Sequence, residues 1–202
     1  DGTHRTCKAL VAHGAKHLVL IDSISERRAP TAGRVNEAEQ MSKEEWSSYR
    51  ERITTSARIG AEEYGLTVGI HAHAAGFMDF EPELERLLSE VDEEILKICF
   101  DTGHHAYAGF DPVEFMQKYI SRISYMHFKD IDPDVKQKVL DNRTGFYDAC
   151  GQGIFCNLGD GDVDFPTVRK ILLENNFEGW CTVEQDCDPL LDPNPLSDAQ
   201  LN

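Results

Sequence analysis

The stretch Ile95-Leu-Lys-Ile-Cys-Phe-Asp-Thr-Gly-His-His105 decides the fold that we expect, because a short apolar run ends in an acid and two imidazoles. An apolar run of this length, closed by a glycine-containing turn, is typical of a buried strand. Enzymes built from parallel strands and helices carry their catalytic groups at the carboxyl ends of the strands. We therefore predict that Asp101 lies at the reactive end of a parallel strand.

Three other apolar runs end in the same way, at His71, His127 and Glu184. One of these runs precedes the stretch, and two follow it. Because parallel strands bring their carboxyl ends to one edge of a sheet, the four side chains are expected to meet there. The repetition indicates a shared site more strongly than any one of the four motifs does.

Strands and helices are expected to alternate along the whole chain. The expected strands cover residues 17–21, 67–71, 95–100, 123–128 and 180–184. The expected helices cover residues 6–14, 42–65, 81–89, 112–119, 135–140 and 165–175. This alternation predicts βαβ units and a parallel sheet, so the fold class is α/β. Ligand-type residues at four strand ends favour a ring of strands over an open doubly wound sheet, which uses a single switch point.

We therefore expect one domain over residues 1–202, with the fold of a (β/α)8 TIM barrel. A closed barrel usually takes about 250 residues. The chain is shorter, offers five clear strands and begins at Asp1 rather than at Met. The N-terminal strand or strands of the barrel are thus expected to be missing, and a weaker run at residues 153–157 could supply a sixth strand.

The composition argues against several classes of partner. With 36 acidic and 20 basic residues, the net charge of −16 repels phosphate backbones, so no nucleic-acid partner is expected. No apolar run approaches the roughly 18–20 residues of a membrane span, and no basic-then-apolar leader opens the chain. We expect a cytoplasmic protein with no membrane partner. The six cysteines lack C-x-x-C spacing, which indicates reduced, partly buried thiols, with a zinc site as the alternative.

Asp101, His127 and Glu184 are ligand types for a divalent metal. Carboxylate oxygen and imidazole nitrogen suit Mn²⁺, Co²⁺, Mg²⁺ and Zn²⁺, and we favour Mn²⁺ or Co²⁺. Taken singly, each of these residues is more often a helix cap or a loop residue. Three of them in register at strand ends favour a metal site.

The fourth ligand is open between an imidazole and a carboxylate. His71 and His73 share one face of their strand, because side chains alternate with a period of two. Asp79 follows in the next loop, and a preference for a carboxylate ligand selects it. In the alternative interpretation, either histidine packs against a neighbouring loop.

Two further side chains are candidates for proton transfer. His104 lies three residues after Asp101, where it could contact the metal, a substrate hydroxyl or the moving proton. Lys129 lies two residues after His127 and shares its face of the strand. The alternative for Lys129 is a surface ion pair with Asp130 or with the aspartate at position 132.

Five segments together resemble a known family. They are residues 100–109, 111–112, 125–133, 159–165 and 178–186, which carry the Asp-Thr-Gly-His and Val-Glu-Gln-Asp motifs. In combination they are similar to the inosose dehydratase branch of the xylose-isomerase-like sugar isomerase/epimerase superfamily. The resemblance runs from about residue 66 to residue 189 and extends more loosely back to residue 17.

The resemblance implies a TIM barrel whose metal is held by two acidic residues, an aspartate and a histidine. Asp101, His127 and Glu184 match three of these positions. The first acidic position departs from the family pattern: His71 stands near the strand end, and Asp79 aligns with a glutamate of the dehydratase branch. The implied substrate is a small polyhydroxy ketone or sugar, and a homodimer is an open possibility.

The reaction expected from the resemblance is the metal-dependent dehydration of a keto-inositol or related keto-polyol through an enediolate. His71 or His73 would act as the base, because imidazole titrates near neutral pH. Lys129 or His104 would act as the acid or orient the substrate oxygens. The same site would serve a ketose isomerase or epimerase if the proton returned to carbon. A nuclease and a non-catalytic barrel fragment are the remaining hypotheses.

Overall fold

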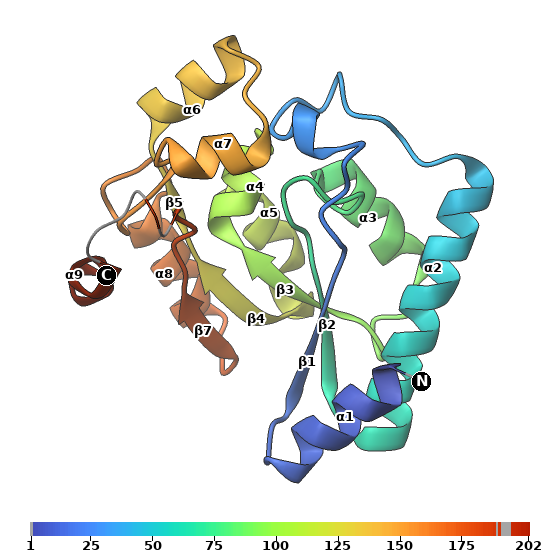
Figure 1. Cartoon of the computed structure of the whole chain (residues 1–202). Coiled ribbons are helices and arrows are strands. Elements are labelled where there is room, and N and C mark those ends of the chain that lie inside the picture. Colours follow the sequence, from blue (N-terminus) through green and yellow to red (C-terminus); the bar gives the residue numbers. More distant parts are fainter. Residues whose placement is uncertain (1, 189, 191–194) are drawn as a thin grey trace.

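One parallel sheet forms the centre of the molecule. The computed structural model describes residues 2–188, 190 and 195–202. The five strands of the sheet are β1 (His17–Ile21), β2 (Thr67–His71), β3 (Lys97–Asp101), β4 (Ile123–Phe128) and β7 (Trp180–Val183), in the order β1-β2-β3-β4-β7. Every neighbouring pair is parallel, and the sheet is curled (Figure 1). The five predicted strands are confirmed.

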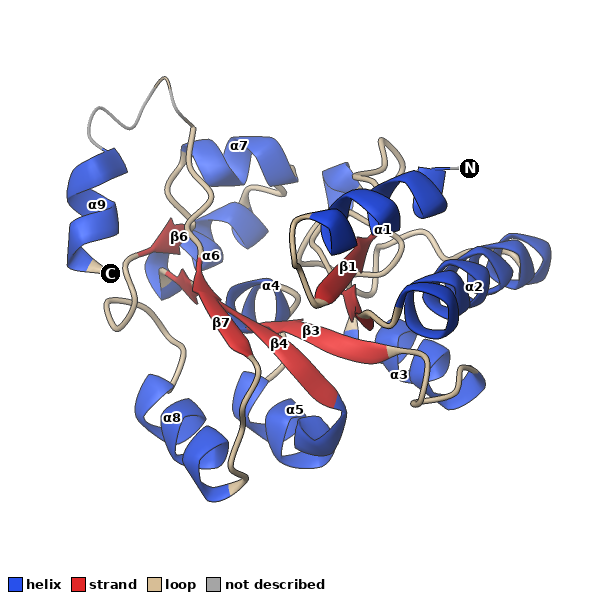
Figure 2. Ribbon diagram, turned by 90° about the horizontal axis from the view of Figure 1, so that it is seen from below, coloured by secondary structure: helices blue, strands red, loops and turns tan. Residues whose placement is uncertain are grey.

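Helices cover the outside of the curl and its carboxyl end. They are α1 (Gly2–Ala12), α2 (Lys43–Arg58), α3 (Glu81–Glu90), α4 (Thr102–Tyr107), α5 (Pro112–Tyr119), α6 (Pro133–Asp141), α7 (Phe146–Gly151), α8 (Phe165–Glu174) and α9 (Pro195–Leu201). Figure 2 shows α2, α3, α5 and α8 along the convex side of the sheet. The six predicted helices are confirmed, whereas α4, α7 and α9 were not predicted.

The long second helix shows how local sequence sets an element boundary. Ser42 and Glu45 form a reciprocal cap at the start of α2: Glu45 N donates to Ser42 Oγ at 3.1 Å, and Ser42 N donates to Glu45 Oε2 at 2.7 Å. After Arg58 the helix continues as one wider turn, Ile59–Glu63, and the chain then enters β2. The helix begins where the sequence predicts it.

The predicted sixth strand at residues 153–157 is wrong as a strand of the main sheet. Only β6 (Phe155–Cys156) is extended there, and it pairs antiparallel with β5 (Asp130–Ile131) in a separate two-stranded sheet. The buried Asp130 carboxylate holds this region, because it accepts hydrogen bonds from the backbone N–H groups of Gly159, Gly161 and Val163. Residues 155–163 therefore fold around Asp130 and add no strand to the main sheet.

Alternation along each strand separates the core from the site. Phe100 of β3 stacks on Phe115 of α5, with ring centroids 4.9 Å apart, so this face of the strand packs against the helices. Cys99 and Asp101, the neighbours of Phe100 in sequence, point to the opposite, concave face. Burial of a large apolar side chain such as Phe100 contributes about 1.5–3 kcal/mol. The helix-packed core thus fixes the strand ends that carry the polar side chains.

β1 and β7 are the two edges of the sheet. Trp180 of β7 is 67% exposed there.

Within the part of the chain that the structure describes, no helix combines the length and the apolar character needed to cross a bilayer.

Candidate metal centre

Three of the predicted ligands meet at the carboxyl end of the curled sheet. The register places Asp101 of β3 directly beside His127 of β4. Glu184 follows β7, and its N–H donates to Phe128 O at 3.0 Å, which ties it to the end of β4. The ends of three adjacent parallel strands therefore deliver the three side chains to one place.

The three side chains have the geometry of an incomplete metal-ligand set. His127 Nδ1 lies 3.5 Å from Asp101 Oδ2 and 3.3 Å from Glu184 Oε2. Among the described residues, the buried atoms Asp101 Oδ2 and His127 Nδ1 have no hydrogen-bond partner. A buried polar atom without a hydrogen bond costs about 1–3 kcal/mol, and a cation bound at His127 Nδ1 would offset that cost. This donor set of two carboxylates and one imidazole fits a divalent metal.

Lys129 supplies a positive charge inside the same cluster. Its ammonium Nζ lies 3.3 Å from Asp101 Oδ2, 3.3 Å from Glu184 Oε2 and 3.1 Å from Asp186 Oδ2. The side chain is only 1% exposed. Burial alone would lower the pKa of Lys129, but the Asp101, Asp186 and Glu184 carboxylates outweigh it and hold the pKa above its ordinary value. Lys129 is therefore protonated at neutral pH.

The alternative surface pairing of Lys129 is not observed. Asp130 instead binds the loop that contains Gly159 and Gly161. Asp132 caps α6, where its Oδ1 accepts from Asp134 N and Val135 N at 2.9 Å. The structure thus turns Lys129 inward and its aspartate neighbours toward backbone groups.

The Asp-Thr-Gly-His motif is built around Lys129. Asp101 caps α4 by accepting from His104 N at 2.9 Å. Thr102 Oγ1 accepts from Lys129 N at 3.0 Å and donates to Lys129 O at 2.7 Å. A Cβ at Gly103 would lie 2.5 Å from Lys129 Cγ, so glycine leaves the room that the lysine side chain needs. Lys129 Nζ in turn donates to His104 Nε2 at 3.0 Å.

Three imidazoles border the ligand set. His71, His73 and His104 each offer a nitrogen within 4.8 Å of the others. Burial lowers the pKa of His71 to about 3, and burial together with the Lys129 ammonium holds the pKa of His104 well below its ordinary value. Burial also lowers the pKa of His73. All three rings are therefore neutral at pH 7, the form in which imidazole binds metals and accepts protons.

The structure does not bring Asp79 into any of these groups. Asp79 lies in the loop after β2, where its Oδ2 accepts from Ala75 N at 3.0 Å and its backbone N donates to Glu83 Oε2 at 3.1 Å. Its carboxyl is buried, and burial raises its pKa to about 7. Asp79 as the fourth ligand stays a prediction.

Two side chains in the cluster were not assigned a role from the sequence. Asp186 contacts Lys129, and the signal was present because Asp186 follows Glu184 by two residues. Cys99 lies two residues before Asp101, and its Sγ is 3.6 Å from His127 Nε2. The same period of two that placed Lys129 beside His127 could have identified both.

Comparison with known proteins places the chain in a family. The model of the family described as "Xylose isomerase-like TIM barrel" matches residues 1–201. An inosose dehydratase of Clostridium botulinum (strain Alaska E43 / Type E3) is 36% identical over 156 residues, which cover 77% of this chain and 52% of that protein. The rhizopine catabolism protein MocC of Rhizobium meliloti is 32% identical over 188 residues, which cover 93% of this chain and 57% of that protein. The chain spans about half the length of the curated relatives it matches.

Solved structures share the fold at low sequence identity. The probable 3-DHS dehydratase AsbF of Bacillus anthracis has a TM-score of 0.72 and 18% identity, over 99% of this chain and 67% of its own. The IolI protein with a bound zinc atom has a TM-score of 0.71 and 16% identity, over 99% and 64%. An L-ribulose 3-epimerase has a TM-score of 0.65 and 13% identity, over 98% and 57%. These matches and the curled parallel sheet confirm the predicted fold class and resemblance: the chain belongs to the xylose isomerase-like TIM barrel family.

Proposed function

We propose that this chain carries the site of a metal-dependent lyase, which dehydrates a keto-inositol or related keto-polyol through an enediolate. The observation that carries the proposal is the convergence of Asp101, His127 and Glu184, with the Lys129 ammonium beside them and with buried atoms that make no hydrogen bond among the described residues. Relatives named inosose dehydratase supply the substrate class. The acidic chain supports a small, non-nucleic-acid substrate.

Asp101, His127 and Glu184 would hold the divalent metal. We favour Mn²⁺ or Co²⁺, with Mg²⁺ and Zn²⁺ as alternatives, and the IolI neighbour has a bound zinc. Either Asp79 or His71 would be the fourth ligand, and the ring centroids of His71 and His127 lie 4.8 Å apart. When bound, the metal supplies Lewis acidity toward the substrate ketone and its neighbouring hydroxyl.

His73 is the base that the geometry supports best. Its Nδ1 lies 2.8 Å from Ala74 O, and an N–H that donates to this carbonyl leaves Nε2 as the proton acceptor. His71 is more deeply buried and suits a ligand better, although it remains the second candidate base. Removal of the proton next to the ketone breaks that C–H bond and leaves its electron pair on the enediolate.

Lys129 is the proton donor in this proposal. A proton from its ammonium would go to the β hydroxyl as the C–O bond breaks, so that water leaves and the C=C bond of an enone forms. The His104 imidazole accepts a hydrogen bond from Lys129 and would take the second place in this proton path. The rings of Phe146 and Phe155 cover these groups, with Phe155 5.3 Å from the His104 ring. An apolar cover of this kind limits water at the reacting atoms.

An isomerase or epimerase acting on a ketose is the second candidate function. The L-ribulose 3-epimerase neighbour favours it, because the two reactions share the enediolate and differ in where the proton goes next. With Lys129 or His104 returning a proton to carbon, no C–O bond would break.

We further propose a single cytoplasmic domain without nucleic-acid or membrane partners, and a homodimer is the assembly to test first.

The decisive experiment is an assay of the purified chain with 2-keto-myo-inositol in deuterated water. We expect an ultraviolet-absorbing enone that depends on Mn²⁺ or Co²⁺ and disappears with a chelator. Deuterium in recovered substrate without enone would select the isomerase or epimerase. Equal turnover in chelator-treated and metal-loaded protein would contradict both candidates.

A further inference from the structure

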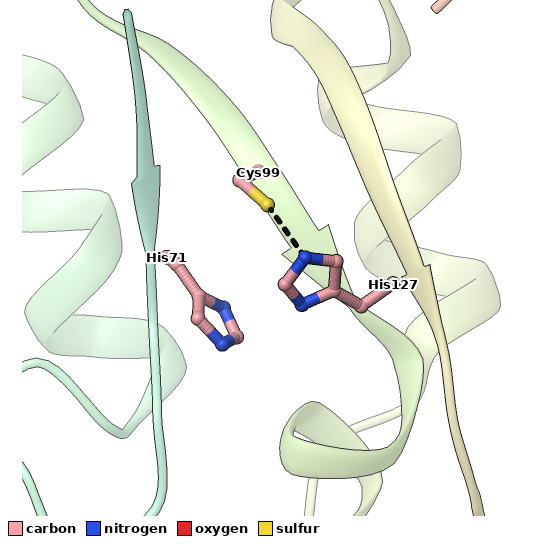
Figure 3. A group of neighbouring side chains, drawn as sticks. All are labelled: His71, Cys99 and His127. Carbon is pink, nitrogen blue, oxygen red and sulfur yellow. Dashed lines mark hydrogen bonds between the residues drawn. The ribbon is translucent and has the colours of Figure 1, made fainter. Parts of the chain in front are cut away.

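A second group of ligand-type side chains lies on the concave face of the sheet, next to Asp101. His71 ends β2, Cys99 lies in β3 and His127 lies in β4, and each offers one ligand atom within 4.8 Å of the others. Figure 3 shows the three side chains pointing toward one another from their strands. We infer that His71, Cys99 and His127 form a thiol-containing metal site, which takes Zn²⁺ or Co²⁺ and shares His127 with the carboxylate set.

The strand register builds this site. Asp101 pairs with His127 and Cys99 pairs with Tyr125, so Cys99 lies directly below Asp101 on the same face. The Cys99 thiol is buried, and its Sγ lies 3.6 Å from His127 Nε2. On the other side, a Cβ at Gly69 would lie 2.9 Å from Cys99 N. A glycine in β2 therefore lets β2 approach Cys99 closely.

An unpaired imidazole nitrogen points to a ligand at this place. His71 is 3% exposed, and its Nδ1 has no hydrogen-bond partner within the described part of the chain. Buried polar atoms are almost always hydrogen-bonded, so each exception calls for an explanation. Coordination of a cation by His71 would satisfy this atom. This inference shares His71 and His127 with the site of the proposed function and adds the buried Cys99 thiol to it.

The ligand types decide which ions the site would select. Thiolate and imidazole ligands favour Zn²⁺ and Co²⁺, whereas carboxylates accept Mn²⁺ and Mg²⁺ as well. On binding, the S–H bond of Cys99 breaks, its proton goes to solvent and a sulfur–metal bond forms. A neutral imidazole has one free lone pair, so His127 serves one set at a time, with Nε2 toward Cys99 or Nδ1 toward Asp101 and Glu184. Occupancy of the two sets is therefore coupled through one imidazole ring.

Cobalt is the probe for the thiol. We expect that Co²⁺ added to chelator-treated protein gives the near-ultraviolet absorption of a thiolate–cobalt bond. Cys99→Ala should remove this absorption even where Co²⁺ still binds to the carboxylate set. The matched control is Cys7→Ala, which removes another buried thiol in contact with neither histidine and should keep the absorption. X-ray absorption of the zinc-loaded protein should show sulfur at about 2.3 Å.

Two outcomes would overturn the inference: zinc surrounded only by oxygen and nitrogen in the unmodified protein, or cobalt–thiolate absorption that persists in Cys99→Ala. If Cys99→Ala fails to fold by circular dichroism, Cys99→Ser and the zinc–sulfur measurement on the unmodified chain decide. Mn²⁺ binding, followed by electron paramagnetic resonance, reports the carboxylate set. It should be lost in Glu184→Gln and kept in Cys99→Ala, so failure of one site is distinguishable from failure of the other.

Discussion

Asp101 and Asp79 are two equally buried carboxyls with opposite acid–base behaviour. Each is 3% exposed. Burial disfavours the Asp101 carboxylate, but His104, the Lys129 ammonium and His127 together hold its pKa well below the ordinary value. Burial raises the pKa of Asp79 to about 7. The nearest cation to Asp79 is already engaged, because the Arg28 guanidinium pairs with Glu83 at 2.8 Å. Burial alone therefore does not decide whether a carboxyl is ionised, and the polar and charged groups beside Asp101 make the difference.

Removal of the Lys129 ammonium is expected to have the largest effect. Lys129→Met leaves Asp101 and Glu184 facing one another without a buried cation and removes the proposed acid. We expect kcat/KM for keto-polyol dehydration to fall about 10²–10⁴-fold, the usual contribution of a positioned acid. The control Lys170→Met removes an exposed lysine of α8 and should leave kcat/KM unchanged. Full turnover in Lys129→Met would exclude Lys129 from the reaction.

The second test uses the pH dependence of stability. Between pH 3.8 and about 7 the unfolded chain has released the Asp79 proton while the folded chain retains it, so the free energy of unfolding falls as pH rises. This contribution is complete below pH 3.8 and lost above about pH 7. Asp101 acts in the opposite sense, since its lowered pKa stabilises the fold above the ordinary aspartate range and that stability is lost toward acid.

Asp79→Asn should therefore flatten one part of the stability profile. Relative to the unmodified chain, its free energy of unfolding should gain up to about 4 kcal/mol on going from pH 4 to pH 8. Urea unfolding in the presence of a chelator measures this difference without interference from metals. Asp148→Asn, at an exposed aspartate, is the control that should follow the unmodified chain. Parallel profiles for Asp79→Asn and the unmodified chain would show that Asp79 is ionised in the folded state.

Metal affinity separates the two carboxyls in a third way. Asp101→Asn should weaken Mn²⁺ binding by at least 10–100-fold, roughly what loss of an outer-shell partner already costs. Asp79→Asn should leave Mn²⁺ binding unchanged, because Asp79 lies outside the described groups of metal-type ligands. Isothermal titration calorimetry on both variants makes the comparison. An equal loss in both variants would instead establish Asp79 as the fourth ligand.

The same pair of residues shows which parts of the site could be predicted from sequence. Asp101, His127 and Glu184 follow apolar runs, and parallel pairing necessarily brings such strand ends together. Asp79 follows no strand directly, so its position depends on the fold of a loop. That loop turns its carboxylate to Ala75 N, and no periodic pattern encodes this contact. Sequence reasoning thus succeeded where secondary structure fixes position.

The same reasoning applies to the fold. The five strands were predictable from their apolar runs, whereas the pairing of Phe155 with Ile131 was not. That pairing depends on backbone hydrogen bonds to the Asp130 carboxylate from residues about thirty positions later in the chain, such as Gly159. The partners of Lys129 could not be predicted from the sequence for the same reason, since Asp186 lies 57 positions away. Contacts made by single side chains across loops carry no local sequence signal.

Alanine substitutions at Gly103 and Gly76 are expected to have the smallest effects on stability and kcat. A Cβ at Gly103 collides with the Cβ and Cγ of Lys129, whereas a Cβ at Gly76, in the loop before Asp79, meets His73 O at 3.2 Å. Gly103→Ala should destabilise the fold by about 1–3 kcal/mol through overpacking and lower kcat by moving the ammonium. An alanine within a helix such as α4 otherwise stabilises by about 1 kcal/mol relative to glycine. Gly76→Ala should cost less and leave kcat unchanged, as measured by urea unfolding and the enone assay. Because helix propensity and overpacking have opposite signs at position 103, a stabilised Gly103→Ala with full kcat would mean that the glycine does not position Lys129.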